Sequence, residues 1–299
     1  MGSHDGEVRV TQTRQVFDLP DVTATFMVAA HSDRGAVRAV NEDSFLAIAP
    51  LFVVADGMGG HAFGDRASQA AVATFVEAIN LSEPVRPQQV LDAITSANEA
   101  VLALPGDAIS GTTVTGVAFV AVGLAENHHW MAFNVGDSRT YSWDGRTLKQ
   151  LTVDHSAVQE LVDLGEITRA EAEVHPQRNI VTRALGATAV VEPDIWLLPA
   201  RERQTFLLCS DGLTKELSDD EIARIIIFHN SQSVREEGEP ALSLAERLVN
   251  AAIAAGGSDN ITVVIVESEL SGGSSVPHDE DTIERGSTTG MLEDTRPRG

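Results

Sequence analysis

The chain has 299 residues, of which 43% are hydrophobic, so it is long enough to bury a sizeable core in one or two domains. It carries 44 acidic residues against 21 basic ones, a formal net charge of -23, which argues against nucleic acid as a partner because its binding requires a basic face. The single cysteine excludes a disulfide framework. The sequence shows no signal-peptide pattern and no apolar run near the roughly 18 residues of a membrane span, so we expect a soluble cytoplasmic protein.

Both ends of the sequence differ from the block between them. Residues 1–22 are polar, show little periodicity and begin with MGSH, which resembles a cloning remnant, so we expect a flexible lead-in. Residues 270–299 are rich in Gly, Ser, Thr, Asp and Glu and have almost nothing apolar to bury, which predicts a disordered tail. One folded domain is therefore expected over residues 23–269.

The first half of the folded block reads as strands, two helices and then strands again. Strand patterns lie in TFMVAAHSD, DSFLAIAP and LFVVAD. Apolar residues at helical spacing follow over residues 65–80, and Pro87 opens a second helix. Four strand patterns come next, in TTVTGVAFVAVGL, HWMAFNVG, RTYSW and TLKQL, and Asp144-Gly145 joins the last two as a hairpin turn.

The second half adds helices and two more strands. Short helices are expected within SAVQELVDLGEITRAEAEVH, a strand in QTFLLCSD, and a helix in DDEIARIII that Ser218 and Glu221 cap together. A helix over residues 242–255 stops at Gly256-Gly257, and NITVVIVE is the last strand. The hairpins imply antiparallel pairing and the helices fall into two groups, so we predict an α+β fold with helices on both outer faces of the sheets.

The glycine-rich turn after LFVVAD has two interpretations. GMGGHA at residues 57–62 fits the G-x-G-x-x-G/A pattern of a dinucleotide-binding turn, as in an oxidoreductase. That interpretation requires an acidic residue about 20 positions on at a strand end, and the candidate, Glu77, lies within a helical pattern. Asp56, directly before the turn, would repel a pyrophosphate but would suit a divalent cation.

Aspartates recur beside the predicted strands. A single Asp-Gly pair is usually only a turn, but five aspartates at strand ends are harder to explain in that way. Packed together without compensation, their like charges would cost several kcal/mol, and divalent cations would supply the compensation. Oxygen ligands favour Mg²⁺ or Mn²⁺ over Zn²⁺. The five are Asp43, Asp56, Asp137, Asp211 and Asp259.

Eight motifs occur in the order found in one family. They are SDRGAVRAVNEDS at 32–44, DGMGGH at 56–61, SGTT at 110–113, GDSR at 136–139, LTVDHS at 151–156, TRALG at 182–186, SDGL at 210–213 and GSDNIT at 257–262. Over residues 30–268 the chain thereby resembles the metal-dependent serine/threonine protein phosphatases of type 2C, the PPM family, in their bacterial form. The resemblance implies a four-layer α-β-β-α sandwich of two antiparallel sheets flanked by helices, with a metal centre at one end.

The resemblance assigns ligands to two core ions, Mn²⁺ or Mg²⁺. Asp56 corresponds to the carboxylate that bridges both ions, and the carbonyl of Gly57 corresponds to a ligand of one. Asp211 and Asp259 correspond to the remaining ligands of the first site.

Further residues are assigned in the same way. Asp43 lies at the second ion with Glu42 beside it, and Asp137 matches, with Asp211, a third and weaker ion position of bacterial members. Arg38 matches the arginine that binds the substrate phosphate, and its planar guanidinium suits two phosphate oxygens. Catalysis is thereby assigned to Arg38, Asp56 and Asp211.

The resemblance implies hydrolysis without a phosphoenzyme. Two cations lower the pKa of a shared water and offset charge on the phosphoryl oxygens, which the very slow unaided reaction requires. The proton donor to the leaving group is left open, because a histidine of eukaryotic members is replaced by Met58. For His61 a role in closing the turn by a backbone hydrogen bond is favoured over proton donation, His155 is open in the same way, and a metal-bound water could donate instead.

The function that the resemblance implies is removal of phosphate from Ser and Thr, opposite a bacterial Ser/Thr kinase. A non-catalytic phosphoprotein-binding module of the same fold is the alternative. Residues 157–180 correspond to the mobile flap of bacterial members, which we expect to help select substrates. Thr282 and Thr295 lie in similar acidic contexts, so a phosphothreonine-reading partner could dock on the tail. We expect a monomer.

Overall fold

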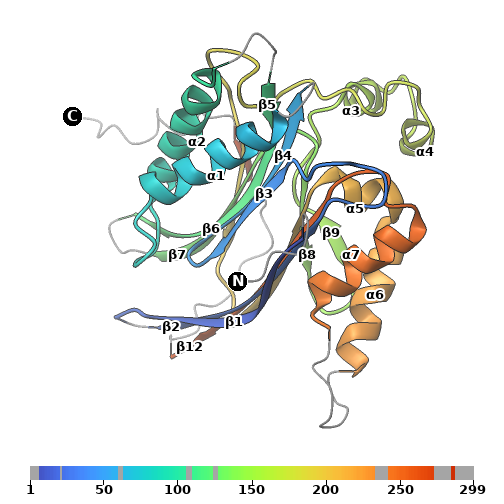
Figure 1. Ribbon diagram of the computed structural model, residues 1–299. Coiled ribbons are helices and arrows are strands. Elements are labelled where there is room, and N and C mark those ends of the chain that lie inside the picture. The colour runs from blue at the N-terminus through green and yellow to red at the C-terminus, as the bar shows by residue number, and fades with distance from the viewer. Residues whose placement is uncertain are drawn as a thin grey trace.

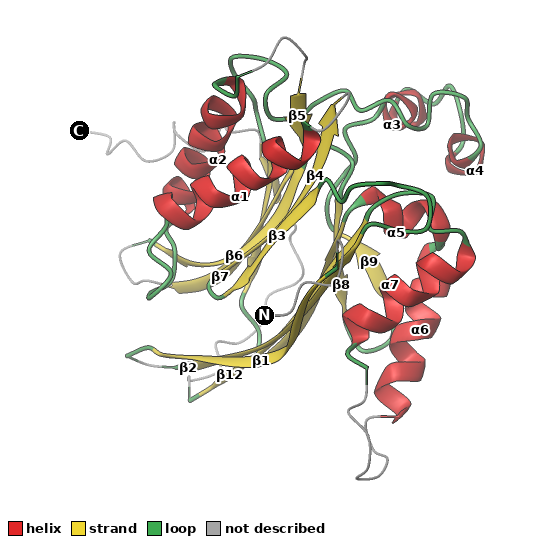
Figure 2. Ribbon diagram, viewed as in Figure 1, coloured by secondary structure: helices red, strands yellow, loops and turns green. Residues whose placement is uncertain are grey.

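The protein is an α+β sandwich of two antiparallel sheets with helices on both outer faces (Figures 1 and 2). The computed structural model describes residues 7–20, 22–59, 63–105, 110–123, 127–232, 242–272 and 284–286. The four-layer α-β-β-α prediction is confirmed. Antiparallel sheets and the position of Glu77 inside a helix contradict the doubly wound dinucleotide fold.

The first sheet has six strands and is covered by the three C-terminal helices, drawn in orange in Figure 1. The N-terminal and C-terminal parts of the folded block lie side by side in this sheet, because the last long strand of the chain pairs with the second strand. The strands in spatial order are β1 (Val8–Asp18), β2 (Thr23–Asp33), β12 (Ile261–Ser271), β11 (Arg203–Cys209), β8 (Arg139–Trp143) and β9 (Leu148–Gln150). The helices are α5 (Asp211–Glu216), α6 (Asp219–Gln232) and α7 (Leu244–Ala255).

The second sheet has seven strands and is covered by two helices that run across it. Six strands lie in the order β13 (Glu284–Gly286), β10 (Asp194–Pro199), β7 (Asn127–Val135), β6 (Val114–Val122), β4 (Leu51–Gly59) and β3 (Asp43–Ile48), and β5 (Ser110–Thr112) pairs with the end of β4. The helices are α1 (Gly64–Ala78) and α2 (Pro87–Leu102). Among the described residues, no helix is both long enough and apolar enough to cross a membrane.

Three apolar layers hold these elements together. Aromatic side chains of both sheets meet in the central layer, where the rings of Trp130 and Phe206 lie 4.8 Å apart. Phe75 of α1 stacks on Phe133 of β7 in the layer beneath α1 and α2. The third layer lies between the first sheet and α5 to α7. Since aromatic burial dominates core energetics, these layers fix the strand ends on which the aspartates lie.

A hairpin of two short helices projects beyond the sandwich. These helices are α3 (Ala157–Asp163) and α4 (Arg169–Glu173), and none of their residues is buried. Ser156 caps α3, and Thr168 caps α4 with Glu171. The two ends of this flap segment, residues 157–180, are fastened together because the N–H of Ala157 donates to the carbonyl of Ile180 at 2.9 Å.

The flexible lead-in predicted for residues 1–22 is wrong where the structure describes it. Residues 8–18 form β1, which pairs with β2 along nearly its whole length. Phe17 packs edge-on against Phe26, and Arg9 forms an ion pair with Glu246 of α7 at 3.0 Å. An edge strand exposes half of its side chains to water, so its composition is polar although its backbone is ordered.

The tail departs from its prediction at two places. Strand β12 continues to Ser271, past the predicted boundary, and residues 284–286 pair with the edge strand β10 as β13. The rest of the predicted tail, with Thr282 and Thr295, lies outside the described residues.

Candidate active site

Asp56 lies in the second half of β4, directly before Gly57. It pairs in register with Asp43, so both aspartates lie at the same end of the β3–β4 ladder. The Asp56 carbonyl accepts hydrogen bonds from the N–H of Thr113 and the hydroxyl of Thr112, both at 2.9 Å. Its own N–H donates to the Thr113 hydroxyl at 3.1 Å, so the backbone of Asp56 is fixed on both sides.

Gly57 can only be glycine at this point of the chain. Its N–H donates to the carbonyl of Glu42 at 3.1 Å. A Cβ atom would lie 2.1 Å from the carbonyl oxygen of Gly64 and 2.5 Å from that of Glu42, far inside van der Waals contact. The absence of a side chain therefore allows the backbone at the start of α1 to pack directly against Gly57.

Asp43 is buried and only half satisfied. The hydroxyl of Ser210 donates to its Oδ2 at 2.7 Å and itself accepts from the N–H of Thr262 at 2.9 Å. The Oδ1 atom of Asp43 has no hydrogen-bond partner. Burial raises the pKa of Asp43 to about 7. An unpaired buried carboxylate oxygen is costly, and a bound cation would compensate its charge.

Asp137 follows β7 on a turn that His155 holds in place. Gly136 adopts a φ of 114°, and its N–H donates to Nδ1 of His155 at 3.0 Å, while the His155 N–H donates to the Gly136 carbonyl at 2.9 Å. Burial, with a contribution from Asp211, raises the pKa of Asp137 to about 7. His155 thus positions Asp137, and it does not line the cleft described below.

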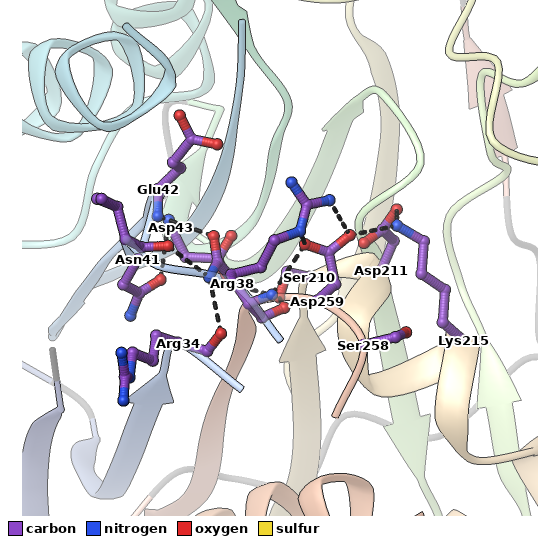
Figure 3. Close-up of polar contacts among 12 residues, drawn as sticks. Arg34, Arg38, Asn41, Glu42, Asp43, Ser210, Asp211, Lys215, Ser258 and Asp259 are labelled. Atoms are coloured by element: carbon purple, nitrogen blue, oxygen red, sulfur yellow. Dashed lines mark hydrogen bonds and ion pairs between the residues drawn. The ribbon is translucent and has the colours of Figure 1, made fainter. Parts of the chain in front are cut away.

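Asp211 and Asp259 lie beside strands of the first sheet and share a lysine (Figure 3). Asp211 is the first residue of α5, directly after β11, and Asp259 lies in the loop before β12. The ammonium of Lys215 is 2.6 Å from Oδ2 of Asp211 and 2.7 Å from Oδ2 of Asp259. The other oxygen of Asp211 has no hydrogen-bond partner.

Arg38 also contacts Asp259, with both arms of its guanidinium. Its Nε lies 2.8 Å from Oδ1 and its Nη2 lies 2.9 Å from Oδ2 (Figure 3). Asn260 fixes the loop that carries Arg38, since its side-chain amide donates to the carbonyls of Arg34 and Val40, at 3.0 and 2.9 Å. Glu42 ends this loop, and its carboxylate points away from Asp259 in Figure 3.

The electrostatics of these carboxylates fit divalent cations. Burial, followed by the charges of Asp43, Asp211 and Asp137, raises the pKa of Asp56 well above its usual value. Burial also raises the pKa of Asp211, against the opposing effect of Lys215. A cluster of oxygen donors with unpaired buried atoms suits Mg²⁺ or Mn²⁺. The structure thus brings together the predicted Asp43, Asp56, Gly57, Asp137, Asp211 and Asp259, whose assignment as ligands stays a prediction.

A second group of ligand-type side chains lies elsewhere. In the described part of the chain, only Glu7, His31 and Asp33 place three ligand atoms within 4.8 Å of one another. Arg9 already donates to Glu7 at 2.6 Å, so a positive side chain already offsets the negative charge of this group.

A cleft of about 1140 Å³ opens over the aspartates. Its described lining includes Arg38, Glu42, Met58 and Lys215, and the flap segment forms part of its wall. No histidine is present among the described lining residues. His61 lies outside the described residues, so the proton donor is not assigned to a side chain.

Sequence reasoning missed three residues that shape the site. Ser210 bonds Asp43 inside SDGL, Asn260 holds the Arg38 loop from inside GSDNIT, and Lys215 pairs with two aspartates. The Lys215 contact had a detectable signal, because Asp211 and Lys215 are four positions apart on one helix face. Nothing in the sequence pattern marks the contacts across the two sheets.

The chain is similar to bacterial serine/threonine phosphatases. PstP of Mycobacterium tuberculosis is 40% identical over 252 residues, which cover 82% of this chain and 46% of that protein, so the chain spans about half of that relative's length. The phosphatase stp of Listeria welshimeri is 36% identical over 249 residues, covering 80% of this chain and 94% of that protein.

Solved structures agree with the sequence relatives. MsPP from Mycobacterium smegmatis, a PPM Ser-Thr phosphatase in complex with cacodylate, has a TM-score of 0.68 at 36% identity and covers 80% of this chain and 97% of that one. The catalytic domain of PstP in complex with two manganese ions has a TM-score of 0.66 at 36% identity, covering 83% and 99%. The family described as protein phosphatase 2C matches residues 29–251. The chain therefore belongs to the protein phosphatase 2C family.

Proposed function

We propose that this protein is a metal-dependent protein phosphatase that hydrolyses phosphoserine and phosphothreonine. The observation that carries the proposal is the convergence of buried and half-buried aspartates from both sheets at one cleft, where one carboxylate oxygen of Asp43 and one of Asp211 have no hydrogen-bond partner. The Mn²⁺-bound PstP structure supports Mn²⁺ or Mg²⁺ as the cofactor.

The donor set would hold two core ions, with room for a third. Asp56, Asp211 and Asp259 line the cleft with Gly57, and Asp43 lies beneath them. Asp137 lines the cleft close enough to Asp211 for the charge of Asp211 to raise the pKa of Asp137, which suits the third position. When bound, the ions lower the pKa of a water and offset phosphoryl charge.

The chain's own residues then bind and orient the substrate. Arg38 presents a planar fork at the rim, suited to two phosphate oxygens. Asn260 fixes the loop that carries Arg38, and the hydrogen bond from Gly57 to Glu42 fixes the end of that loop beside Asp56. Cys209 is fully buried, and burial raises the pKa of its thiol, so a cysteine nucleophile is ruled out.

The partners follow from this activity. We propose phosphorylated proteins as substrates, a Ser/Thr kinase as the opposing enzyme, a cytoplasmic location and a monomeric state. Thr282 and Thr295 would serve as docking sites for a phosphothreonine-reading protein once phosphorylated. Mass spectrometry after incubation with the opposing kinase tests the last point, and unmodified threonines would count against it.

Phosphate release from a phosphothreonine peptide tests the activity. We expect phosphate release with Mn²⁺ and none above background in chelator. Asp211→Asn should lower the rate of release by about 100-fold or more, because it removes one carboxylate oxygen and the negative charge. Asp92→Asn, on the exposed face of α2, is the matched control and should keep full activity. Turnover that survives chelator would contradict the proposal, and peptide binding without release would favour the non-catalytic module.

A further inference from the structure

Lys215 lies between two carboxylates that are predicted to bind metal. Its ammonium contacts one oxygen of Asp211 and one of Asp259, at 2.6 and 2.7 Å. The side chain reaches Asp211 from one turn later on α5, and α5 itself is anchored by the fully buried Leu213. The contact therefore depends on a rigid element and not on a loop.

The position of this ammonium is the one that a shared cation would take. A divalent ion bound by the same two oxygens would have to lie between them, at about 2.0–2.1 Å from each in the case of Mg²⁺. A lysine ammonium and a divalent ion cannot share that space, and their like charges repel. Arg38 contacts Asp259 alone, so Lys215 is the described residue that joins both carboxylates.

We propose that Lys215 is a built-in competitor for divalent metal at the Asp211–Asp259 pair. It stabilises the metal-free site by neutralising these carboxylates and must leave when an ion enters. An interaction that stabilises only the metal-free state weakens metal binding by the same free energy. Lys215 thereby sets the metal concentration at which the enzyme is loaded. This inference rests on the metal site of the proposed function.

Metal affinity in variants gives the first test. We expect Lys215→Met to bind Mn²⁺ about tenfold more tightly or better by titration calorimetry, and Lys215→Arg, which keeps a cation there, to stay within about threefold of wild type. Lys149 is exposed on β9 and is the only other lysine in the sequence. Lys149→Met is therefore the matched control for the loss of one positive charge, and its affinity should not change.

The two-lysine composition allows a second test on the unmodified protein. Selective ¹³C labelling of the lysine ε-carbons should give two signals, which Lys149→Met assigns. Titration with Mg²⁺ should shift the Lys215 signal in a saturable way as its ammonium leaves the carboxylates, while the Lys149 signal stays in place.

The outcomes separate this inference from the proposed function. If wild type binds Mn²⁺ but Lys215→Met binds it with equal affinity, or if the Lys215 signal does not respond to saturating Mg²⁺, the competition is disproved and the phosphatase proposal stands. If wild type binds neither ion, the metal site itself is wrong, and this inference with it.

Discussion

Arg38 holds Asp259 through two short contacts on one guanidinium, of 2.8 and 2.9 Å. Phosphate oxygens would use the same two donors, so substrate has to replace the carboxylate or share it. We expect Arg38→Ala to lower kcat/KM for a phosphothreonine peptide by about 10- to 150-fold, the equivalent of about 1.5–3 kcal/mol for charged hydrogen bonds. The loss should appear mainly in KM, and steady-state kinetics measure it.

Arg34 provides the control for this substitution. It is exposed, lies on the same loop, and its guanidinium points away from Asp259 in Figure 3. Arg34→Ala should keep the wild-type KM, and Arg38→Lys should recover only part of the loss because an ammonium cannot present two parallel donors. Equal KM values for Arg34→Ala and Arg38→Ala would argue against Arg38 as the phosphate ligand.

The sequence predicted the aspartates at the residue scale but not their counter-ions. Each aspartate lies beside a strand and a glycine turn, which is a local pattern that can be read without the fold. The pairing of Arg38 with Asp259 joins residues 221 positions apart, and Ser210 reaches Asp43 across 167 positions. Such contacts depend on how two sheets pack, so no local pattern contains them.

The role of the flap segment can be tested without disturbing the core, because its helices contain no buried residue. Arg169, Ala172 and Glu173 line the cleft, while Leu164 and Val174 are 73% and 79% exposed. The hydrogen bond of Ala157 to Ile180 closes the base of the hairpin and would survive its truncation.

We expect a short Gly-Ser linker in place of residues 164–175 to lower kcat/KM for the phosphothreonine peptide by about tenfold or more, since part of the substrate contact surface is removed. Turnover of a small aryl phosphate and the melting temperature should stay unchanged, because these residues bury nothing. Equal losses on the peptide and on the small substrate would contradict a role in peptide recognition.

Element prediction succeeded where apolar periodicity is strong and failed at edges and short turns. The α1 and α2 stripes, the β8–β9 hairpin and the Ser218–Glu221 capping box are all present. β1 was missed because an edge strand is half solvated, and α5 because six residues cannot show helical periodicity.

The metal centre lies where the two sheets meet. Asp43 and Asp56 lie on strands of the second sheet and Asp137 follows another, while Asp211 and Asp259 flank strands of the first. The like charges of these carboxylates repel one another between the two sheets, and bound divalent ions would attract both sets. Metal loading should therefore stabilise the whole sandwich and not only the loops that carry the ligands.

The pH dependence of stability tests this coupling. The pKa values of Asp43 and Asp137 are raised to about 7 in the metal-free fold, against about 3.9 in an unfolded chain. Between these limits the folded state binds protons that the unfolded state has lost, so the free energy of unfolding should fall as pH rises from about 4 to about 7. In chelator, each loss of about 1 kcal/mol should lower the melting temperature by about 2–4 °C.

With saturating Mn²⁺ the ions replace the protons, and the fall in the free energy of unfolding should disappear or reverse. Asp137→Asn cannot titrate and should flatten the chelator curve, whereas Asp92→Asn should not. Calorimetric melting curves at several pH values, with and without Mn²⁺, measure the difference, and parallel curves in the two conditions would show that the aspartates do not couple metal binding to the fold.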